Sequence, residues 1–384
     1  MSAAITPITM PKWGLTMTEG KVVGWLKKPG QGFAAGEEIL EIETTKITNT
    51  FEAAEPGTLR RIVAPAGTTL PVGALLAVAA AAEVADSEID AFVAGFAAPE
   101  PAAAAEAASG APEPREIEAG GRRLRYLEMG EGAGLPVVLV HGFGGDLNTW
   151  MFVQPALSEG RRTVALDLPG HGGSAKVVGA GDPEVMTDAV DALRTALGIE
   201  QAHLVGHSMG GAVAALVALR RPQAAASLTL IATAGLGPEI NTGFIERFIR
   251  AGRRREAAEM LAELVYDPAL VSRAMVEEVL RYKRLDGVGA ALETIARAWF
   301  ADGRQSLDLV GQIGSLALPV QLIWGRDDHI IPVAHAEARA ARLPTHILAE
   351  TGHLPHLERA GEVGRLLAGF IGQPASMGAV ASDG

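Results

Sequence analysis

Ser208 lies in a sequence that could make a serine a nucleophile. The motif Gly206-His207-Ser208-Met209-Gly210 follows an apolar, strand-like run at 203–205 and opens a helical run over 211–221. Small residues on either side allow the backbone to turn sharply and to lift the serine oxygen clear of a sheet. A Gly-x-Ser-x-Gly match is weak by itself, but its position between a strand and a helix makes it specific. The pattern predicts a serine that attacks a carbonyl carbon.

Two later motifs could supply the acid and the base that such a serine needs. The segment 324–332 (WGRDDHIIP) resembles the acid-bearing loop of α/β-hydrolases, where the acid lies four residues beyond the Trp, and this selects Asp328 over Asp327. The segment 352–356 (GHLPH) resembles the histidine loop of that family and selects its first histidine, His353. Serine, acid and histidine then follow the chain order of this fold. His353 would take the serine proton, and Asp328 would fix the imidazole tautomer and stabilise its charged form. The second histidine of the loop, His356, is expected to pack or to support the site.

The glycine-rich segment 141–145 (HGFGG) could supply the donors that stabilise an oxyanion. It follows a strand that ends at Val140, and the backbone N–H groups of Phe143 and Met209 are the expected oxyanion hole. Each such donor is worth roughly 3 kcal/mol in the transition state. In the loop 167–174, His171 and Ser174 are interpreted as structural, because the glycines and Pro there shape a turn.

Lys46 is the second residue on which chemistry could take place, because it lies at the midpoint of an internal repeat. A shift of 37 positions matches three glycines and four apolar residues with residues of the same kind: Gly20 with Gly57, Gly30 with Gly67, Gly36 with Gly73, Val22 with Leu59, Trp25 with Ile62, Phe33 with Leu70 and Ile39 with Leu76. So short a repeat forms one packed unit, since a single copy could not bury its own apolar face. The polar segment between the two copies predicts a hairpin with Lys46 at its exposed tip.

Residues 5–78 resemble the lipoyl domain of 2-oxo acid dehydrogenase complexes, both in this repeat and in the opening segment 10–20 (MPKWGLTMTEG). The resemblance implies that Lys46 carries lipoate in amide linkage, as a long arm that ends in a dithiolane. Many lipoyl domains have Asp before the lysine, where this chain has Thr45. Biotinyl domains share the fold but place Met on both sides of the lysine, which Thr45 and Ile47 do not match. An unmodified, solvated lysine is the remaining alternative.

The N-terminal part is thus expected to be an all-β sandwich of the lipoyl/biotinyl type over residues 1–80, followed by a linker over 81–115. Residues 83–96 predict one amphipathic helix, too short for a whole partner-binding domain. From Ala97 to about Glu116 the chain is rich in Ala, Pro and Glu. Such a linker is extended, and at about 3 Å per residue it would reach roughly 60 Å.

Residues 116–374 are expected to adopt the α/β-hydrolase fold, a mainly parallel sheet with helices on both faces. A helical stretch over 235–305 interrupts the strand pattern and predicts a lid, and residues 375–384 predict a flexible tail. The expected strands are 137–140, 163–166, 203–205, 228–231, 320–324 and 345–348.

Composition narrows the classes of function. The 384 residues allow two or three domains, and the absence of cysteine excludes disulfides and thiol nucleophiles, so any redox sulfur must come from a cofactor. The net charge of −12 argues against nucleic acid or an anionic membrane as a partner. No signal peptide precedes the repeat, and the longest apolar run, 70–82, is too short to span a bilayer, which predicts a cytoplasmic protein. The nine histidines do not require a metal site. The sequence contains no Walker-type phosphate loop and no dinucleotide-binding fingerprint.

Taken together, the two halves resemble the acetyltransferase component of bacterial acetoin dehydrogenase systems, in which a lipoyl domain precedes an α/β-hydrolase-like domain. The resemblance implies a thiamine-diphosphate-dependent partner that cleaves acetoin and acetylates the lipoyl group on Lys46. It also implies transfer of the acetyl group to coenzyme A, a dihydrolipoamide dehydrogenase that reoxidises the dithiol, a lipoate ligase or transferase, and an oligomeric complex. The His-x-x-x-Asp-Gly motif of the usual acyltransferase domain is absent from this sequence. The run Arg253–Arg255 could meet the phosphates of coenzyme A, and a solvated face is the alternative.

The mechanistic hypothesis is that Ser208 attacks the thioester carbonyl and forms an acetyl-serine. The thiol of coenzyme A, deprotonated by His353, would then attack that ester while the lid excludes water. The main alternative is a hydrolase that uses the same residues to release acetate, or to cleave an ester or a carbon–carbon bond, with the lipoyl domain only recruiting it. A non-catalytic scaffold is a third possibility.

Overall fold

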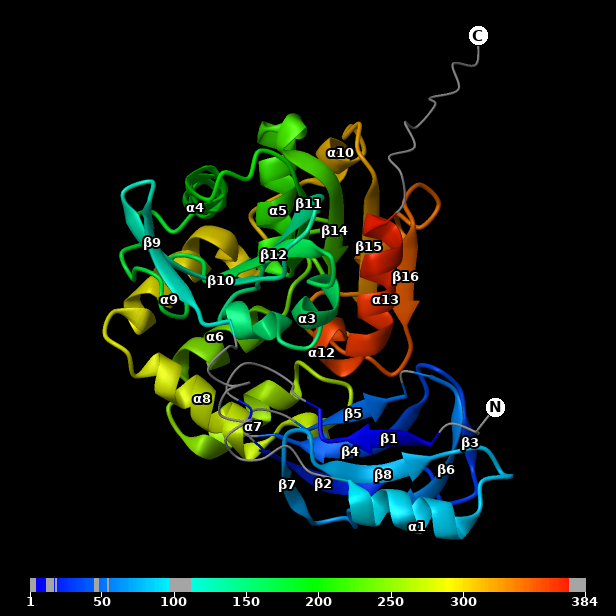
Figure 1. Ribbon diagram of the computed structural model, residues 1–384. Helices are drawn as coiled ribbons and strands as arrows, with labels where there is room; N and C mark the ends of the chain where they lie inside the picture. The colour runs from blue at the N-terminus through cyan, green and yellow to red at the C-terminus, as the bar shows by residue number, and fades with distance from the viewer. Residues whose placement is uncertain are drawn as a thin grey trace. The chain divides into compact units, whose positions relative to one another are not determined.

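The computed structural model describes residues 5–11, 17, 19–44, 48–53, 55–96 and 112–372 (Figure 1). They form two compact units: one contains the residues up to Pro112 together with 269–275, and the other contains the remaining residues from Glu113 on. Lys46, most of the expected linker (97–111) and the expected tail (375–384) lie outside the described residues. Within the described ranges, no helix is both long enough and apolar enough to cross a membrane.

The N-terminal unit is a sandwich of two four-stranded sheets whose strands pair antiparallel. One sheet has the order β1 (Thr6–Thr9), β8 (Leu75–Ala79), β6 (Gly57–Ile62), β3 (Gly32–Phe33). The other has the order β5 (Thr48–Glu52), β4 (Glu38–Glu43), β2 (Glu19–Trp25), β7 (Thr69–Pro71). Under the shift of 37 positions, β2, β3 and β4 of the first half-repeat correspond to β6, β7 and β8 of the second. The expected sandwich is confirmed.

The repeat extends to individual backbone hydrogen bonds. Gly30 and Gly67 both have φ = +89°, a conformation that glycine adopts at little cost. Gly30 N donates to Leu59 O at 2.7 Å, and Gly67 N donates to Val22 O at the same distance. The donors and the acceptors are each 37 positions apart. Each half therefore completes its turn by bonding to the other half, which is why one copy could not fold alone.

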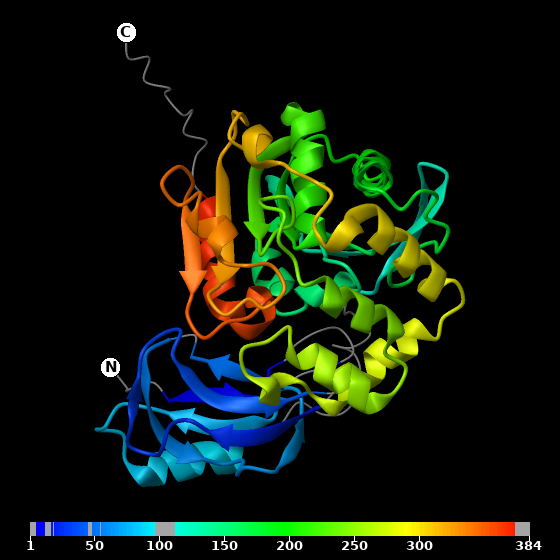
Figure 2. The same cartoon turned by 180° about the vertical axis from the view of Figure 1, so that it is seen from behind.

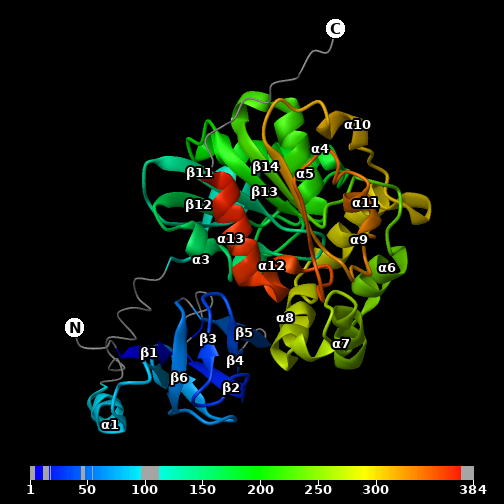
Figure 3. The ribbon, with the colours of Figure 1, turned by 90° about the vertical axis from the view of Figure 1, so that its right-hand side faces the viewer.

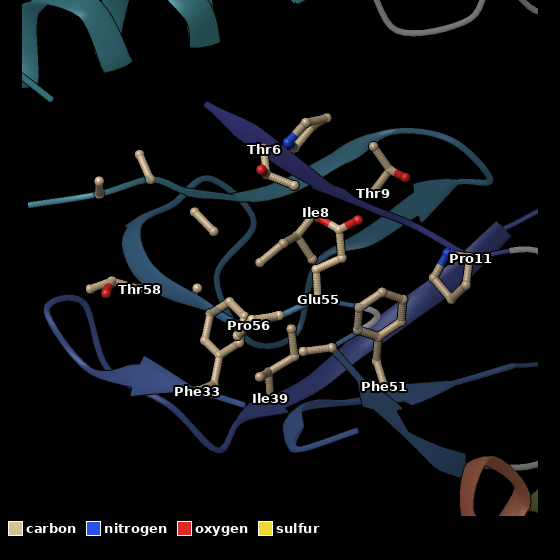
Figure 4. A pocket seen from close by; sticks show the side chains of 16 residues that line it. Thr6, Ile8, Thr9, Pro11, Phe33, Ile39, Phe51, Glu55, Pro56 and Thr58 are labelled. Carbon is tan, nitrogen blue, oxygen red and sulfur yellow. The ribbon is translucent and has the colours of Figure 1, made fainter. Parts of the chain in front are cut away.

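A hollow of about 580 Å³ opens the sandwich at one edge (Figure 4). Its interior is apolar, with Ile8, Phe33, Ile39 and Phe51 among its lining residues, and threonines of β1 and β6 lie at its rim. Glu55 is the one acidic residue in that lining. The rest of the lining is uncharged, which fits an open part of the sandwich core.

Helix α1 (Asp86–Gly95) confirms the amphipathic helix expected after the repeat. Ile89 is fully buried and joins the cluster of Leu75 and Val78, with Phe92, Val93 and Phe96 packed around it. Its charged face is tied to β6 by ion pairs from Arg60 and Arg61 to Asp86 and Asp90. The helix therefore packs on the sandwich as part of the N-terminal unit.

The C-terminal unit is built on an eight-stranded sheet with the order β16-β15-β14-β13-β11-β12-β10-β9. All six expected strands are present, and they run parallel. Their observed bounds are β11 (Gly134–Val140), β12 (Arg161–Leu166), β13 (Ala202–His207), β14 (Ala225–Ile231), β15 (Val320–Gly325) and β16 (Thr345–Leu348). Two further strands, β9 (Arg115–Ala119) and β10 (Arg122–Met129), form an antiparallel hairpin at one edge that the sequence analysis did not predict.

Helices cover both faces of this sheet (Figure 3). One face carries α4 (Pro183–Ala196) and α5 (Met209–Arg220), and the other carries α3 (Gln154–Leu157) and α13 (Ala360–Ile371). The short helices α10 (Val310–Ile313), α11 (Ala334–Glu337) and α12 (Pro355–Glu358) lie in the connections. The apolar residues of β13, and those of β11 from Val137 to Val140, are almost wholly inaccessible, as a parallel sheet covered on both faces requires.

A helical insertion follows β14 and precedes β15. It contains α6 (Thr242–Arg250), α7 (Arg254–Ala262), α8 (Arg273–Lys283) and α9 (Val288–Trp299). Within the C-terminal unit these helices lie beyond the carboxyl ends of the parallel strands (Figure 2). Ligands of open α/β sheets bind at that edge. The helices expected over 235–305 are present as this insertion, and its role as a lid stays a prediction.

Candidate active site

Ser208 forms the junction between β13 and α5. Its backbone has φ = +53° and ψ = −120°, outside the regions that non-glycine residues normally occupy. Hydrogen bonds hold this strained conformation on both sides: Ser208 N donates to Ile231 O at 2.9 Å, and Ala234 N donates to Ser208 O at 3.0 Å. A strained serine held at the end of a central strand is the geometry of a nucleophile elbow.

The glycines around Ser208 allow the elbow to fold. A Cβ atom on Gly206 would lie 2.3 Å from Gly210 O, and one on Gly210 would lie 2.3 Å from His141 O. A Cβ atom on Gly211 would lie 2.4 Å from Thr233 Oγ1. The backbones of β11, β13 and α5 therefore approach each other too closely for any side chain, as the sequence pattern predicts.

Replacing Gly206 by alanine is expected to destabilise the C-terminal unit by about 1–3 kcal/mol, because the new methyl group meets backbone atoms that cannot move aside. The matched control is Gly364→Ala in α13, where a Cβ atom meets nothing within 4 Å. That control is expected to stabilise by up to about 1 kcal/mol, because alanine favours the helix. Urea unfolding followed by tryptophan fluorescence measures both, since the buried Trp150, Trp299 and Trp324 all lie in this unit. Equal stabilities for the two variants would contradict this account.

Asp328 and His353 come together from the ends of β15 and β16. Asp328 Oδ2 lies 2.8 Å from His353 Nδ1, and neither side chain is more than 4% exposed. The other oxygen, Oδ1, accepts hydrogen bonds from Ile330 N and Ile331 N at 2.8 and 2.9 Å. These donors orient the carboxylate, so its Oδ2 accepts the proton on Nδ1 of His353 and leaves Nε2 as the nitrogen that can take a proton. The adjacent Asp327 takes no part in this pair.

A stack of aromatic rings backs His353. The rings of His207 and His353 are 4.8 Å apart, those of His207 and His356 4.6 Å, and those of His356 and Trp150 4.7 Å. His207 Nε2 lies 2.8 Å from His353 O, and because a carbonyl only accepts, His207 must be the donor. The residue next to Ser208 thus bonds to the backbone of His353.

The two supporting histidines stay neutral. Burial lowers the pKa of His356 to about 3, and burial, followed by the proximity of His356 and His353, lowers the pKa of His207 well below its ordinary value. Neutral neighbours do not repel an imidazolium, so His353 can become charged during a reaction without opposing positive charges behind it. His356 is fully buried and packs between two rings, in agreement with its interpretation as a packing residue.

The loop after β11 lies directly against the serine. A Cβ atom on Gly142 would lie 2.9 Å from Ser208 Cβ, so the backbone leading to Phe143 passes beside the nucleophile. Met209 is the first residue of α5, and the first N–H groups of a helix have no acceptor within it. The two expected oxyanion residues thus follow Gly142 and Ser208 directly in the chain, and their role as donors stays a prediction.

The buried carboxylate of Asp167 holds together the loops that follow β11 and β12. Asp167 accepts from Leu147 N and Gly173 N, both at 2.7 Å, and is wholly buried. The next residue in the chain, Leu168, donates its N–H to His141 Nε2 at 3.0 Å. Ser174 Oγ donates to Asp167 O at 2.6 Å, so it serves the turn as expected. These bonds join the loops that follow β11 and β12.

The helical insertion packs on Phe143. The Phe143 ring centroid lies 5.8 Å from that of Phe248 in α6 and 5.8 Å from that of Phe300, which follows α9. His171, whose pKa burial lowers well below its ordinary value, contacts the same ring edge-on at 6.1 Å. Three rings therefore contact the Phe143 side chain, and two of them belong to the insertion.

The arginine run of the insertion is largely engaged in ion pairs. Arg254 pairs with Glu277 at 2.6 Å and Arg255 with Glu259 at 2.7 Å, and the Arg255 side chain is 89% exposed. This arrangement is typical of a solvated helix face. Within the described ranges no group of three or more His, Asp or Glu side chains has the arrangement of a metal site.

Sequence reasoning missed three residues that support the site. His207 bonds to His353, Asp167 fixes two loops, and Glu358 accepts hydrogen bonds beside His353. His207 and Asp167 occupy motifs that the sequence analysis used, but His207 bonds to a residue 146 positions away and Asp167 links its own loop to a residue 20 positions before it. Glu358 carried no signal, because an acid in a short helix is usually a surface residue.

The comparisons with known proteins cover both units. The family model described as "alpha/beta hydrolase fold" matches residues 136–360, and that described as "Biotin-requiring enzyme" matches residues 6–78. The chain is 47% identical to the dihydrolipoyllysine-residue acetyltransferase component of the acetoin cleaving system of Pseudomonas putida, over 96% of this chain and 98% of that protein. It is 43% identical to the component of the same description from Cupriavidus necator, over 97% of this chain and 99% of that protein.

The C-terminal unit has further relatives of another kind. It is 31% identical to the 2-hydroxymuconate semialdehyde hydrolase of Pseudomonas sp. strain CF600, over 67% of this chain and 94% of that protein. The solved structure of the 2-hydroxy-6-oxo-6-phenylhexa-2,4-dienoate hydrolase of Rhodococcus sp. strain RHA1 is similar with a TM-score of 0.62 and 25% identity. The similarity covers 67% of this chain and 98% of that one.

Proposed function

Because the chain belongs to the family of dihydrolipoyllysine-residue acetyltransferase components of acetoin cleaving systems, we propose that Ser208, His353 and Asp328 carry its acetyl transfer. It is an acyltransferase that moves an acetyl group from a lipoyl thioester to coenzyme A. The observation that carries the assignment of residues is the buried Asp328–His353 pair, held behind a serine in a strained elbow.

Lys46 would hold the lipoyl group. Strands β4 and β5 pair up to Glu43 and Thr48, and the sequence places Lys46 between those two residues. A primary amine between two paired strands suits an amide-linked arm. When bound, the lipoyl group supplies a thiol that carries acetyl as a thioester.

The geometry of the C-terminal unit supports the following acylation step. Ser208 Oγ attacks the thioester carbonyl while His353 Nε2 takes the serine proton, and Asp328 stabilises the imidazolium. The backbone N–H groups of Phe143 and Met209 receive the negative oxygen. The carbon–sulfur bond then breaks, and His353 returns the proton to the leaving sulfur, which leaves an acetyl ester on Ser208.

The second step reverses the first with a new thiol. His353 removes the proton from the thiol of coenzyme A, whose sulfur forms a bond to the acetyl carbon. The ester bond to Ser208 breaks, and His353 protonates the serine oxygen. Water could take the place of the thiol, so the balance between transfer and hydrolysis depends on how the helical insertion excludes water.

Membership in this family also implies that the chain works with other proteins of an acetoin cleaving system. We propose that these are a thiamine-diphosphate-dependent enzyme that loads the acetyl group, a dihydrolipoamide dehydrogenase and a lipoate ligase or transferase. Assembly with them into an oligomeric complex in the cytoplasm is part of the proposal.

A serine hydrolase is the second candidate, because the C-terminal unit is 31% identical to a hydrolase that acts on 2-hydroxymuconate semialdehyde. The same catalytic residues serve both reactions, and the fold cannot separate them. The two functions differ in the acceptor, so the products decide between them.

Changing Asp328 to asparagine is expected to lower kcat for acetyl-CoA formation by roughly 10⁴-fold, because an amide favours the wrong tautomer of His353. Purified full-length chain is assayed with acetyl-dihydrolipoamide and coenzyme A. The adjacent Asp327→Asn is the matched control and is expected to lose less than about ten-fold, since Asp327 does not bond to the imidazole. Comparable losses in both variants would refute the role of Asp328.

A further inference from the structure

Glu358 is a buried carboxylate that no step of the proposed reaction uses, although it bonds to both neighbours of His353. Its Oε1 accepts from Gly352 N at 2.9 Å and from Leu354 N at 3.2 Å. Its Oε2 lies 3.1 Å from Gly352 N and accepts from Tyr266 N at 2.7 Å. Gly352 and Leu354 flank His353, whereas Tyr266 belongs to the helical insertion. One carboxylate therefore connects the two segments.

The same part of the insertion contacts the histidine loop directly. His353 N donates to Leu264 O at 2.8 Å. A Cβ atom on Gly352 would lie 2.7 Å from Leu264 O and 2.9 Å from Val265 Cα, so the two backbones touch without room for a side chain. The backbone N–H groups of three successive residues, 352 to 354, thus end on Glu358 or on the insertion.

Burying the Glu358 carboxylate costs free energy, because the charged group loses its contact with water. Burial raises the pKa of Glu358, while the hydrogen bonds from Tyr266, Gly352 and Leu354 act in the opposite direction. A surface loop could satisfy its N–H groups with water at no such cost. Glu358 instead uses both oxygens, as acceptors only, to hold two chain segments at one distance.

We propose that Glu358 is a positioning residue that fixes the His353 backbone and couples it to the helical insertion. The inference rests on the proposed function, since it takes His353 as the base. Asp328 orients the imidazole through Nδ1 but does not hold the loop that carries it. A displacement of about 1 Å at a reacting group can cost 10²-fold in rate. Glu358 removes that freedom.

The test is Glu358→Gln, which keeps the shape of the side chain but replaces one acceptor oxygen by a donor. We expect kcat to fall about 10- to 100-fold with KM within about two-fold of the wild-type value, because the base and not the binding of substrate is displaced. Glu350→Gln is the matched control: it removes a carboxylate close to His353 in sequence, and that carboxylate is mostly exposed and lies 3.5 Å from Arg359. The control is expected to keep kcat within about two-fold.

Two assays on the full chain keep this inference separate from the acyltransferase assignment. One measures acetyl transfer from acetyl-dihydrolipoamide to coenzyme A, and the other measures hydrolysis of p-nitrophenyl acetate, which needs only the serine and its base. If the wild-type chain hydrolyses the ester but transfers no acetyl group, the acyltransferase assignment fails, and the ester assay still decides the role of Glu358.

Hydrogen exchange supplies a readout that does not depend on activity. In Glu358→Gln, amide exchange is expected to increase in the peptides that contain 352–354 and 264–266, and to stay unchanged in β11 and β13. If this variant does not fold, Glu358→Asp, which keeps the charge on a shorter side chain, is measured instead, with smaller changes in the same peptides. A folded variant with wild-type kcat, or with unchanged exchange in both segments, would overturn the proposal.

Discussion

Replacing Ser208 by alanine is expected to abolish acetyl transfer to coenzyme A, with a loss of roughly 10⁶-fold, the size of effect seen when a serine hydrolase loses its nucleophile. The substitution removes one oxygen at the tip of the elbow and leaves the backbone bonds from Ser208 N and O in place. Reductive acetylation of the lipoyl group is expected to continue, because it depends on the N-terminal unit. Acetyl-CoA is measured by absorbance, and the acetylated lipoyl peptide by mass spectrometry.

The control for this variant is Ser174→Ala. Ser174 is buried, as Ser208 is, and its hydroxyl bonds to Asp167 O in a neighbouring loop. We expect a loss of stability of about 1 kcal/mol there, with kcat reduced by less than about ten-fold. Retained transfer in Ser208→Ala would show that the thiol attacks the lipoyl thioester directly, and the covalent mechanism would be wrong.

Replacing Lys46 by arginine is expected to remove the acyl carrier while it preserves the catalytic unit. Arginine keeps the positive charge but has no primary amine that can form the amide bond to lipoate. Transfer from acetoin through the assembled system should fall to background. Transfer from free acetyl-dihydrolipoamide should stay within about two-fold of the wild-type rate, since Ser208, Asp328 and His353 are unchanged. Intact-mass spectrometry measures the loss of the lipoyl group.

Lys28→Arg is the matched control, because Lys28 is an exposed lysine of the same unit. Its variant is expected to be lipoylated fully and to support the complete reaction. Lipoylation of the Lys46→Arg chain at another lysine, or full activity of that chain in the assembled system, would contradict the assignment of Lys46.

The sequence predicted the parts of the molecule that local rules determine. Glycines at fixed spacing around Ser208 indicated an elbow, and the structure explains the spacing by backbone contacts too close for a Cβ atom. The repeat indicated the sandwich. Gly30 and Gly67 recur 37 positions apart because both positions need the same positive φ. The strands that carry the site are apolar runs buried on both sides, which sequence patterns identify well.

The missed features depend on contacts between distant segments. His207 bonds to a residue 146 positions away and Glu358 to one 92 positions away, so no local pattern indicates either bond. The β9–β10 hairpin was missed for a different reason: its strands, with sequences REIEA and RRLRYLEM, are rich in charged residues, and β9 is the edge strand of the sheet. Charged residues are favoured on edge strands because they discourage pairing with other chains.

The most direct test of the central claim follows the acetyl group from a synthetic acetyl-dihydrolipoamide thioester given to the purified, lipoylated chain with and without coenzyme A. The account predicts acetyl-CoA in preference to acetate, and loss of this product in Ser208→Ala. Acetate released at the same rate whether or not coenzyme A is present would contradict it, and would make the C-terminal unit a hydrolase.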